Sequence, residues 1–396
     1  MVGHGPRFQN SVSWASKRLL KKDFRHHDRS IRIRSDTGPF CHYSFAEQKL
    51  VNNHRQSRFS AAGYTLLEIL VVCSVAGIMS AQLMPLLGSV RERARRMSCS
   101  NNLKQLGIAL QFYHETYKRL PTNGLYFWTR QSRNGYTWNK ASTGSPFVKL
   151  LPFMEQNPIY SKLDFKLAGP TEDQQFEFQK HRSGKLVRSL IMPYLLCPSA
   201  DLDPHLNGTN QARDPAISCY STSIGSSSMP SRQSWCTDYP GNTFGTGPAE
   251  HGNDGRGYRI SGTFARGLWA AAMRDITDGT AQVIAMGETL PNKSFHQRLG
   301  WMSFNGNWTA TVAPMNYPTI ALGEPGYPGK KDCRHTGNWQ TSNGFRSRHP
   351  GGVQFVFSDG SVHLLSELID YHTYQRLGDR RDGQSIGNWD SFNLSR

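Results

Sequence analysis

The chain has 396 residues, long enough for two domains or for one large domain with appendages. Its net charge of +17 is unevenly spread: residues 1–63 carry +8, residues 64–119 carry +4, and the remaining 277 carry only +5. Because the large C-terminal part is only mildly basic, we expect no dedicated nucleic-acid surface. None of the seven cysteines forms a CxxC pair, which argues against a zinc ribbon or a thioredoxin-type site.

The longest apolar run is LLEILVVCSVAGIMSAQLMPLL, residues 66–87. A helix of this length crosses a hydrocarbon core of roughly 30 Å, so we expect a membrane-spanning helix. The core helix of a soluble protein would show a polar stripe, and the apolar region of a signal peptide is shorter, about 7–15 residues. Glu68 is the one charge in the run. It costs about 2.5–3.5 kcal/mol there unless it has a partner or reaches the headgroups at the membrane edge.

A helical stem is expected to follow. The segment CSNNLKQLGIALQFYHETYKRLPTNG, residues 99–124, carries large apolar and aromatic side chains at spacings of three and four. They are Leu103, Leu106, Leu110, Tyr113 and Tyr117. Pro121 and Gly124 end the pattern. A helix from Tyr64 to about residue 117 would span roughly 80 Å, with its second half packed on a sheet.

After residue 120, short β-like runs alternate with clusters of Gly, Pro, Asn and Ser. The clearest run is VQFVFSDGSVHLL, residues 353–365, in which Asp359-Gly360 is expected to form a two-residue hairpin turn. Asp278-Gly279 is expected to form a second such turn before a run that ends at Glu288. Residues 205–262 are rich in Gly, Ser and Asn and are expected to form long surface loops.

The segment GYTLLE, residues 63–68, resembles the cleavage and methylation motif of type IV prepilins. In that family a prepilin peptidase cuts after the glycine and methylates the new N-terminal amine. The resemblance implies a cut between Gly63 and Tyr64, which makes Tyr64 the methylated first residue and Glu68 the fifth. In pilins that glutamate neutralises the N-terminal amine of a neighbouring subunit. A cation and a carboxylate tolerate lipid better as a pair than singly.

The leader departs from the family pattern, because residues 1–63 are far longer than the usual short basic leader. One hypothesis is that residues 1–50 are a mis-assigned start, and that a start near Val51 leaves Arg55 and Arg58 before the cut. Arginines also follow the apolar run, and the positive-inside rule taken alone weakly favours the opposite orientation. Because the peptidase acts on the cytoplasmic side, we expect the N-terminus inside and the head outside.

From residue 63 to about 387 the chain resembles prepilin-like proteins with Domain of Unknown Function 1559 and a C-terminal H-x9-D-G motif. The resemblance rests on GYTLLE, on MSCSNNLKQLGIALQFYHETY, on DITDGTAQVIAMGE, and on His349 with Asp359-Gly360. It implies an α+β, pilin-like fold in which a long N-terminal hydrophobic helix packs on an antiparallel β-sheet head with long loop insertions. The expected parts are a basic leader (1–63), a transmembrane helix and stem (64–119), and a β-rich head (120–396).

The residues His349, Asp359 and His363 offer nitrogen and oxygen atoms suited to a metal or to acid–base chemistry. The structural alternative is that Asp359 caps amides of the turn while His349 holds the entry to the strand. Gly360 belongs to the same motif. The resemblance to secretion pseudopilins leaves room for a structural calcium ion without a readable ligand set, and no other cofactor is expected.

Five cysteines follow the apolar run and cannot all pair within one chain. Cys99 and Cys197 lie in family-like stretches, and Cys219 and Cys236 are close in sequence. These are the two candidate disulfide pairs, which leave Cys333 alone, although the sequence does not fix the connectivity. Disulfides are allowed if this part of the chain lies outside the cytoplasm.

The sequence favours a structural, non-enzymatic role as a single-pass pilin or pseudopilin subunit of the cytoplasmic membrane, in a pilus or a type II secretion-like assembly. The expected partners are prepilin peptidase, membrane lipid and other pilin-like subunits. An alternative is a prepilin-anchored binding module that recognises polysaccharide or protein. A third is an exported enzyme, for which Asp275, Asp278 and Glu288 are candidate glycosidase carboxylates, although turn chemistry explains Asp278 as well.

Overall fold

The computed structural model describes residues 63–124, 127–129, 137–139, 143–167, 176–206, 210–229, 236–241, 251–252, 257–387 and 389–394. The chain divides into two units, Met1–Thr65 and Leu66–Arg396, and the described helices and strands all belong to the second unit. The expected leader lies outside the described residues except for Gly63.

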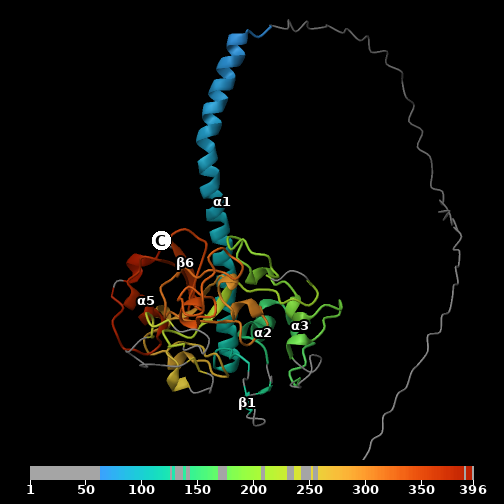
Figure 1. Cartoon of the computed structure of the whole chain (residues 1–396), viewed down its shortest axis with the longest axis vertical. Coiled ribbons are helices and arrows are strands. Elements are labelled where there is room, and N and C mark those ends of the chain that lie inside the picture. Colours follow the sequence, from blue (N-terminus) through green and yellow to red (C-terminus); the bar gives the residue numbers. More distant parts are fainter. Residues whose placement is uncertain are drawn as a thin grey trace, which may run out of the picture. The chain divides into compact units, whose positions relative to one another are not determined.

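The longest element is helix α1, Leu66–Tyr117, which has 52 residues and a length of about 78 Å. Figure 1 shows its first half extending away from the rest of its unit, while the second half runs through it. Leu103, Leu106 and Leu110 are buried, as their spacing predicts, whereas Tyr117 is 57% exposed. The helix ends at the predicted position. Lys118 follows with a φ of +55°, the left-handed conformation that commonly closes a helix.

A five-stranded sheet in the order β5-β3-β4-β6-β7 forms the centre of the head. Its strands are β3 (Tyr220–Ser223), β4 (Ile284–Glu288), β5 (Trp308–Thr309), β6 (Gly352–Phe357) and β7 (Val362–Ser366). Neighbouring strands pair antiparallel except β3 and β5, which are parallel. The sheet is therefore mixed, and the expectation of a purely antiparallel sheet is wrong at this edge. The long connection between β3 and β5 supplies the crossover that a parallel pair requires.

Short elements complete an α+β protein. The strands β1 (Phe127–Thr129) and β2 (Thr137–Asn139) pair antiparallel with each other. The remaining α-helices in the described part of the chain are α2 (Pro146–Leu150), α3 (Asn157–Tyr160), α4 (Trp339–Ser342) and α5 (Tyr371–Gly378), and short 3₁₀ helices lie between them. Of these four short helices, α5 is the longest, with 8 residues, and it begins with a side-chain cap. The side chain of Asp370 accepts a hydrogen bond of 2.8 Å from Thr373 N.

The region expected to form long surface loops contains the core strand β3. All four residues of β3 are buried between β4 and β5. The hydroxyl of Thr222 is accommodated by donating a hydrogen bond of 2.6 Å to Asn307 O. Three serine and threonine residues follow Tyr220 in this strand and show no apolar alternation, which is why composition alone suggests a loop here. The expectation of surface loops is therefore wrong for β3.

Candidate functional site

The ring of His349 is fully buried between two carboxylates. His349 lies just before β6, and its Nδ1 is 2.6 Å from Glu92 Oε1 on α1. Its Nε2 is 3.2 Å from Glu288 Oε1 at the end of β4. The sequence predicts a structural or metal-binding role for this histidine but neither of these two partners. Two features of the sequence could have indicated these partners. Glu92 is a lone glutamate among the arginines after the apolar run, and Glu288 ends an apolar strand.

The contacts of this site favour the charged forms of His349 and Glu92. Burial lowers the pKa of His349, but the hydrogen bonds and charges of Glu288 and Glu92 outweigh burial and raise it above its ordinary value. Burial raises the pKa of Glu92, but hydrogen bonds from His349, Arg95 and Ser199 leave it below its ordinary value. Both shifts favour a protonated imidazole beside an ionised carboxylate.

The other end of the motif forms the turn between β6 and β7. Phe357 N donates to Ser361 O and Gly360 N donates to Phe357 O, both at 2.9 Å, so the loop has three residues, Ser358–Gly360, and not the predicted two. Asp359 Oδ1 accepts hydrogen bonds from Ser361 N at 2.8 Å and from Ser361 Oγ at 2.6 Å. Asp359 therefore serves the turn, as the structural alternative predicts. Gly360 has a φ of +82°, which favours glycine.

This turn docks on one face of α1. Lys104 Nζ donates to Gly360 O at 3.0 Å, and Gln111 Nε2 donates to Ser358 O at 2.8 Å. Between them lies Gly107, where an added Cβ would be 3.1 Å from Gly360 O. Three residues at i, i+3 and i+7 share one face of a helix. Both ends of the H-x9-D-G motif therefore contact α1, His349 through Glu92 and the turn through this face.

The prediction of a second hairpin turn at Asp278-Gly279 is wrong. The segment after Asp278 is a 3₁₀ turn, Thr280–Gln282, that leads into β4, and Asp278 accepts a hydrogen bond of 2.6 Å from Asp382 N. Asp275 accepts from a backbone amide of its own turn, and Glu288 faces the histidine. The three carboxylates proposed for a glycosidase thus have separate partners, and nothing in the described residues brings them together as a pair.

Two disulfides connect distant parts of the chain. Cys99 is bonded to Cys197, and Cys236 is bonded to Cys333. The predicted pairing of Cys219 with Cys236 is therefore wrong, and Cys219 is a free, buried thiol. Burial raises the pKa of Cys219 to about 12. Closeness in sequence misleads here because Cys219 directly precedes β3 in the core.

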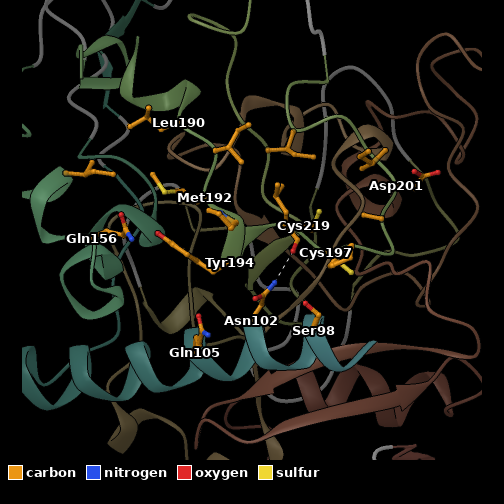
Figure 2. Close-up of a pocket in the computed structure, with 18 of the residues that line it drawn as sticks. Ser98, Asn102, Gln105, Gln156, Leu190, Met192, Tyr194, Cys197, Asp201 and Cys219 are labelled. Atoms are coloured by element: carbon orange, nitrogen blue, oxygen red, sulfur yellow. Dashed lines mark hydrogen bonds between the residues drawn. The ribbon is translucent and has the colours of Figure 1, made fainter. Parts of the chain in front are cut away.

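A groove of about 1010 Å³ runs beside α1. Figure 2 shows Ser98, Asn102 and Gln105 rising from α1 into it. The other side is formed largely by residues 190–202, and both Cys197 and Cys219 line the groove. Asn102 ties the two sides together by donating a hydrogen bond of 2.9 Å to Leu196 O. Cys197 of the Cys99–Cys197 disulfide thus lines the groove, whereas Cys99 is fully buried.

The predicted processing residues lie at the start of α1. Gly63 and Tyr64 precede the helix and are exposed, and Glu68 is exposed in its first turn. Cleavage between Gly63 and Tyr64 stays a prediction. Part of the expected membrane span, residues 82–87, has side chains outside the described set. Within the described residues, no helix has the length and apolar character needed to cross a membrane.

Over residues 88–372 the chain matches the family described as "Protein of unknown function (DUF1559)". The chain belongs to this family. The match includes the stem and the H-x9-D-G motif, so the resemblance drawn from those residues is confirmed. Type II secretion system core protein G of Pectobacterium carotovorum subsp. carotovorum is 32% identical over 71 residues, 18% of this chain and 46% of that protein. The chain thus spans less than half the length of this relative. No solved structure matches the chain.

Proposed function

We propose that this DUF1559 protein is a pilin-like structural subunit, anchored by α1 in the cytoplasmic membrane with its head outside. The observation that carries the proposal is the division of α1 into two unlike halves. Large apolar side chains from Leu66 to Met79 are exposed, whereas Leu103, Leu106 and Leu110 are packed in the head. A helix that exposes apolar side chains on every face needs lipid or other subunits around it.

Three further observations support the proposal. The prepilin-like GYTLLE segment lies where α1 begins. The similarity to Type II secretion system core protein G supports assembly with other pilin-like subunits. The two disulfides support a head outside the cytoplasm, because such bonds persist in oxidising compartments.

The docking of the H-x9-D-G motif gives this role a mechanical basis. A subunit held in an assembly by its N-terminal helix must transmit position and load from that helix to its head. Glu92 and Lys104 of α1 bond to the two ends of the motif, and Cys99 is covalently joined to Cys197 between these positions. The head is therefore fixed to the helix by ionic, hydrogen-bonding and covalent contacts.

The first experiment is intact-mass and N-terminal analysis of the protein from its native membrane, with and without prepilin peptidase. The proposal predicts a mature chain that starts at N-methylated Tyr64 only when the peptidase is present. A Gly63→Val variant should stay uncut. A chain that is uncut in the presence of the peptidase, or is cut elsewhere, would contradict prepilin processing.

A second candidate function is a binding module that uses α1 only as an anchor, and the groove beside α1 is the observation that favours it. The variant Glu68→Ala separates the two candidates. A pilin-like subunit should lose crosslinks between copies while remaining in the membrane fraction, and a monomeric module should be unaffected. Glu115→Ala is the matched control, because Glu115 is an exposed glutamate near the other end of α1.

A further inference from the structure

Four buried side chains with metal-binding atoms meet where α1 joins the sheet. One ligand atom from each of Cys99, Cys197, Glu288 and His349 lies within 4.8 Å of the other three. Cys197 Sγ is 3.5 Å from His349 Nε2 and 3.7 Å from Glu288 Oε1, and those two atoms are 3.2 Å apart. Zinc bonds of about 2.0–2.3 Å give a tetrahedron with edges of roughly 3.3–3.8 Å, so these separations already suit the ion.

A second layer of contacts orients two of the four groups. The other ring nitrogen of His349, Nδ1, is paired with Glu92 at 2.6 Å. The second oxygen of Glu288, Oε2, accepts a hydrogen bond of 3.0 Å from Gln354 N. A histidine that binds zinc almost always gives its remaining N–H to a carboxylate or carbonyl, and a carboxylate ligand is itself hydrogen-bonded. The surroundings of the cluster thus match those of a zinc centre.

We propose that reduction of the Cys99–Cys197 disulfide converts this cluster into a Zn²⁺ site with Cys99, Cys197, Glu288 and His349 as ligands. A dithiol reductant supplies two electrons and two protons, so that the S–S bond becomes two thiols and the dithiol becomes a disulfide. Zn²⁺ then displaces the two thiol protons and any proton on His349 Nε2. Two thiolates with one imidazole and one carboxylate form a donor set that favours zinc.

The groove supplies the route for both reactants, because Cys197 lines it. The disulfide and the zinc site both join α1 to the head, because Cys99 lies on α1 and its partners Cys197, Glu288 and His349 all belong to the head. Bound zinc would join α1 to the head while the two cysteines are reduced, and the disulfide would join them after oxidation. The cluster is thus a redox-dependent metal site, whatever the assembly in which the chain functions.

The test uses the full chain in non-ionic detergent, fully oxidised or reduced with a phosphine and then freed of excess metal. Each form is incubated with Zn²⁺, desalted, and analysed for zinc by mass spectrometry. The reduced chain should retain about one Zn²⁺ at this site, and the oxidised chain should retain none there. Co²⁺ should give thiolate-to-metal and tetrahedral absorption bands only in the reduced chain. Zinc should also raise the Tm of the reduced chain.

Variants locate the ion. His349→Gln and Glu288→Gln should abolish the Co²⁺ bands, and Glu92→Gln, which leaves all four ligands in place, should weaken zinc binding by about 10–100-fold. His363→Gln is the matched histidine control and should bind normally.

The second cysteine cluster, which contains Cys236, Asp238 and Cys333, must be separated from the first. Cys236→Ser/Cys333→Ser should keep the Co²⁺ bands. Loss of the bands in that variant, equal zinc in the oxidised chain, or unchanged binding in both His349→Gln and Glu92→Gln would overturn the proposal.

Discussion

Replacing His349 with alanine removes the imidazole that lies between the carboxylates of Glu92 and Glu288 in the interior. The His349 side chain is 0% exposed, that of Glu288 is 2% exposed and that of Glu92 is 18% exposed, so water cannot fully solvate the remaining charges. Removing one partner of a buried ion pair costs about 3–5 kcal/mol, because the other charge stays buried and uncompensated. We expect His349→Ala to lower the free energy of unfolding by that amount.

The assay is thermal unfolding of the oxidised full chain in detergent, followed by tryptophan fluorescence. A destabilisation of 1 kcal/mol shifts Tm by about 2–4 °C in domains of 150–250 residues. We use the lower value for this larger head, so His349→Ala should lower Tm by roughly 6–10 °C. The control is His372→Ala, at an exposed position in the first turn of α5, which should change stability by less than about 0.5 kcal/mol.

A double variant separates charge from packing. Adding Glu288→Gln to His349→Ala removes one of the two unpaired charges, so it should recover at least about 1 kcal/mol of the loss. Purely additive losses would show that lost packing, and not an unpaired charge, explains the effect. A Tm shift below roughly 2 °C for His349→Ala would refute the reasoning altogether.

Three further predictions use the same assay. Gly107→Val should cost about 1–3 kcal/mol, because even a Cβ at Gly107 would lie 3.1 Å from Gly360 O; an unchanged Tm would mean that the turn does not dock tightly. Asp370→Ala should cost about 1 kcal/mol at neutral pH. Since hydrogen bonds lower the pKa of Asp370, that difference should persist above its ordinary pKa and vanish as pH falls through the lowered value. Cys333→Ser, which breaks the bond to Cys236 across 97 residues, should cost about 2–5 kcal/mol in the oxidised chain and nothing in the reduced chain.

The elements predicted from the sequence were those whose signal is local. The spacing of Leu103, Leu106 and Leu110 predicts the buried face of α1, and the helix ends where Pro121 and Gly124 indicate. The alternation in β6 is likewise encoded within one short segment, whereas the turn that follows has three loop residues and not the predicted two. Such elements can be predicted because the periodicity of neighbouring residues along the chain determines which face of a helix or strand is buried.

The site could not be predicted in the same way, since its contacts join distant segments. Glu92 and His349 are 257 residues apart, and no local pattern links them. The strand β3 was missed because its serine and threonine side chains show no apolar alternation, although all four of its residues are buried. The partner of Cys236 was misassigned because distance along the chain says little about distance in space.

The nine-residue spacing of the motif follows from matching lengths along α1. The six residues of β6 extend about 20 Å, and the twelve steps along α1 from Glu92 to Lys104 rise about 18 Å. Gln354, midway along β6, donates a hydrogen bond of 3.0 Å to Arg96 O, so strand and helix stay in contact between the two ends. Two residues added to β6 would preserve its alternation but move the turn about 7 Å along α1. Only one end of the motif could then reach its partner on α1. The spacing of the motif therefore corresponds to the distance along α1 between Glu92, which contacts His349, and Lys104, which contacts Gly360.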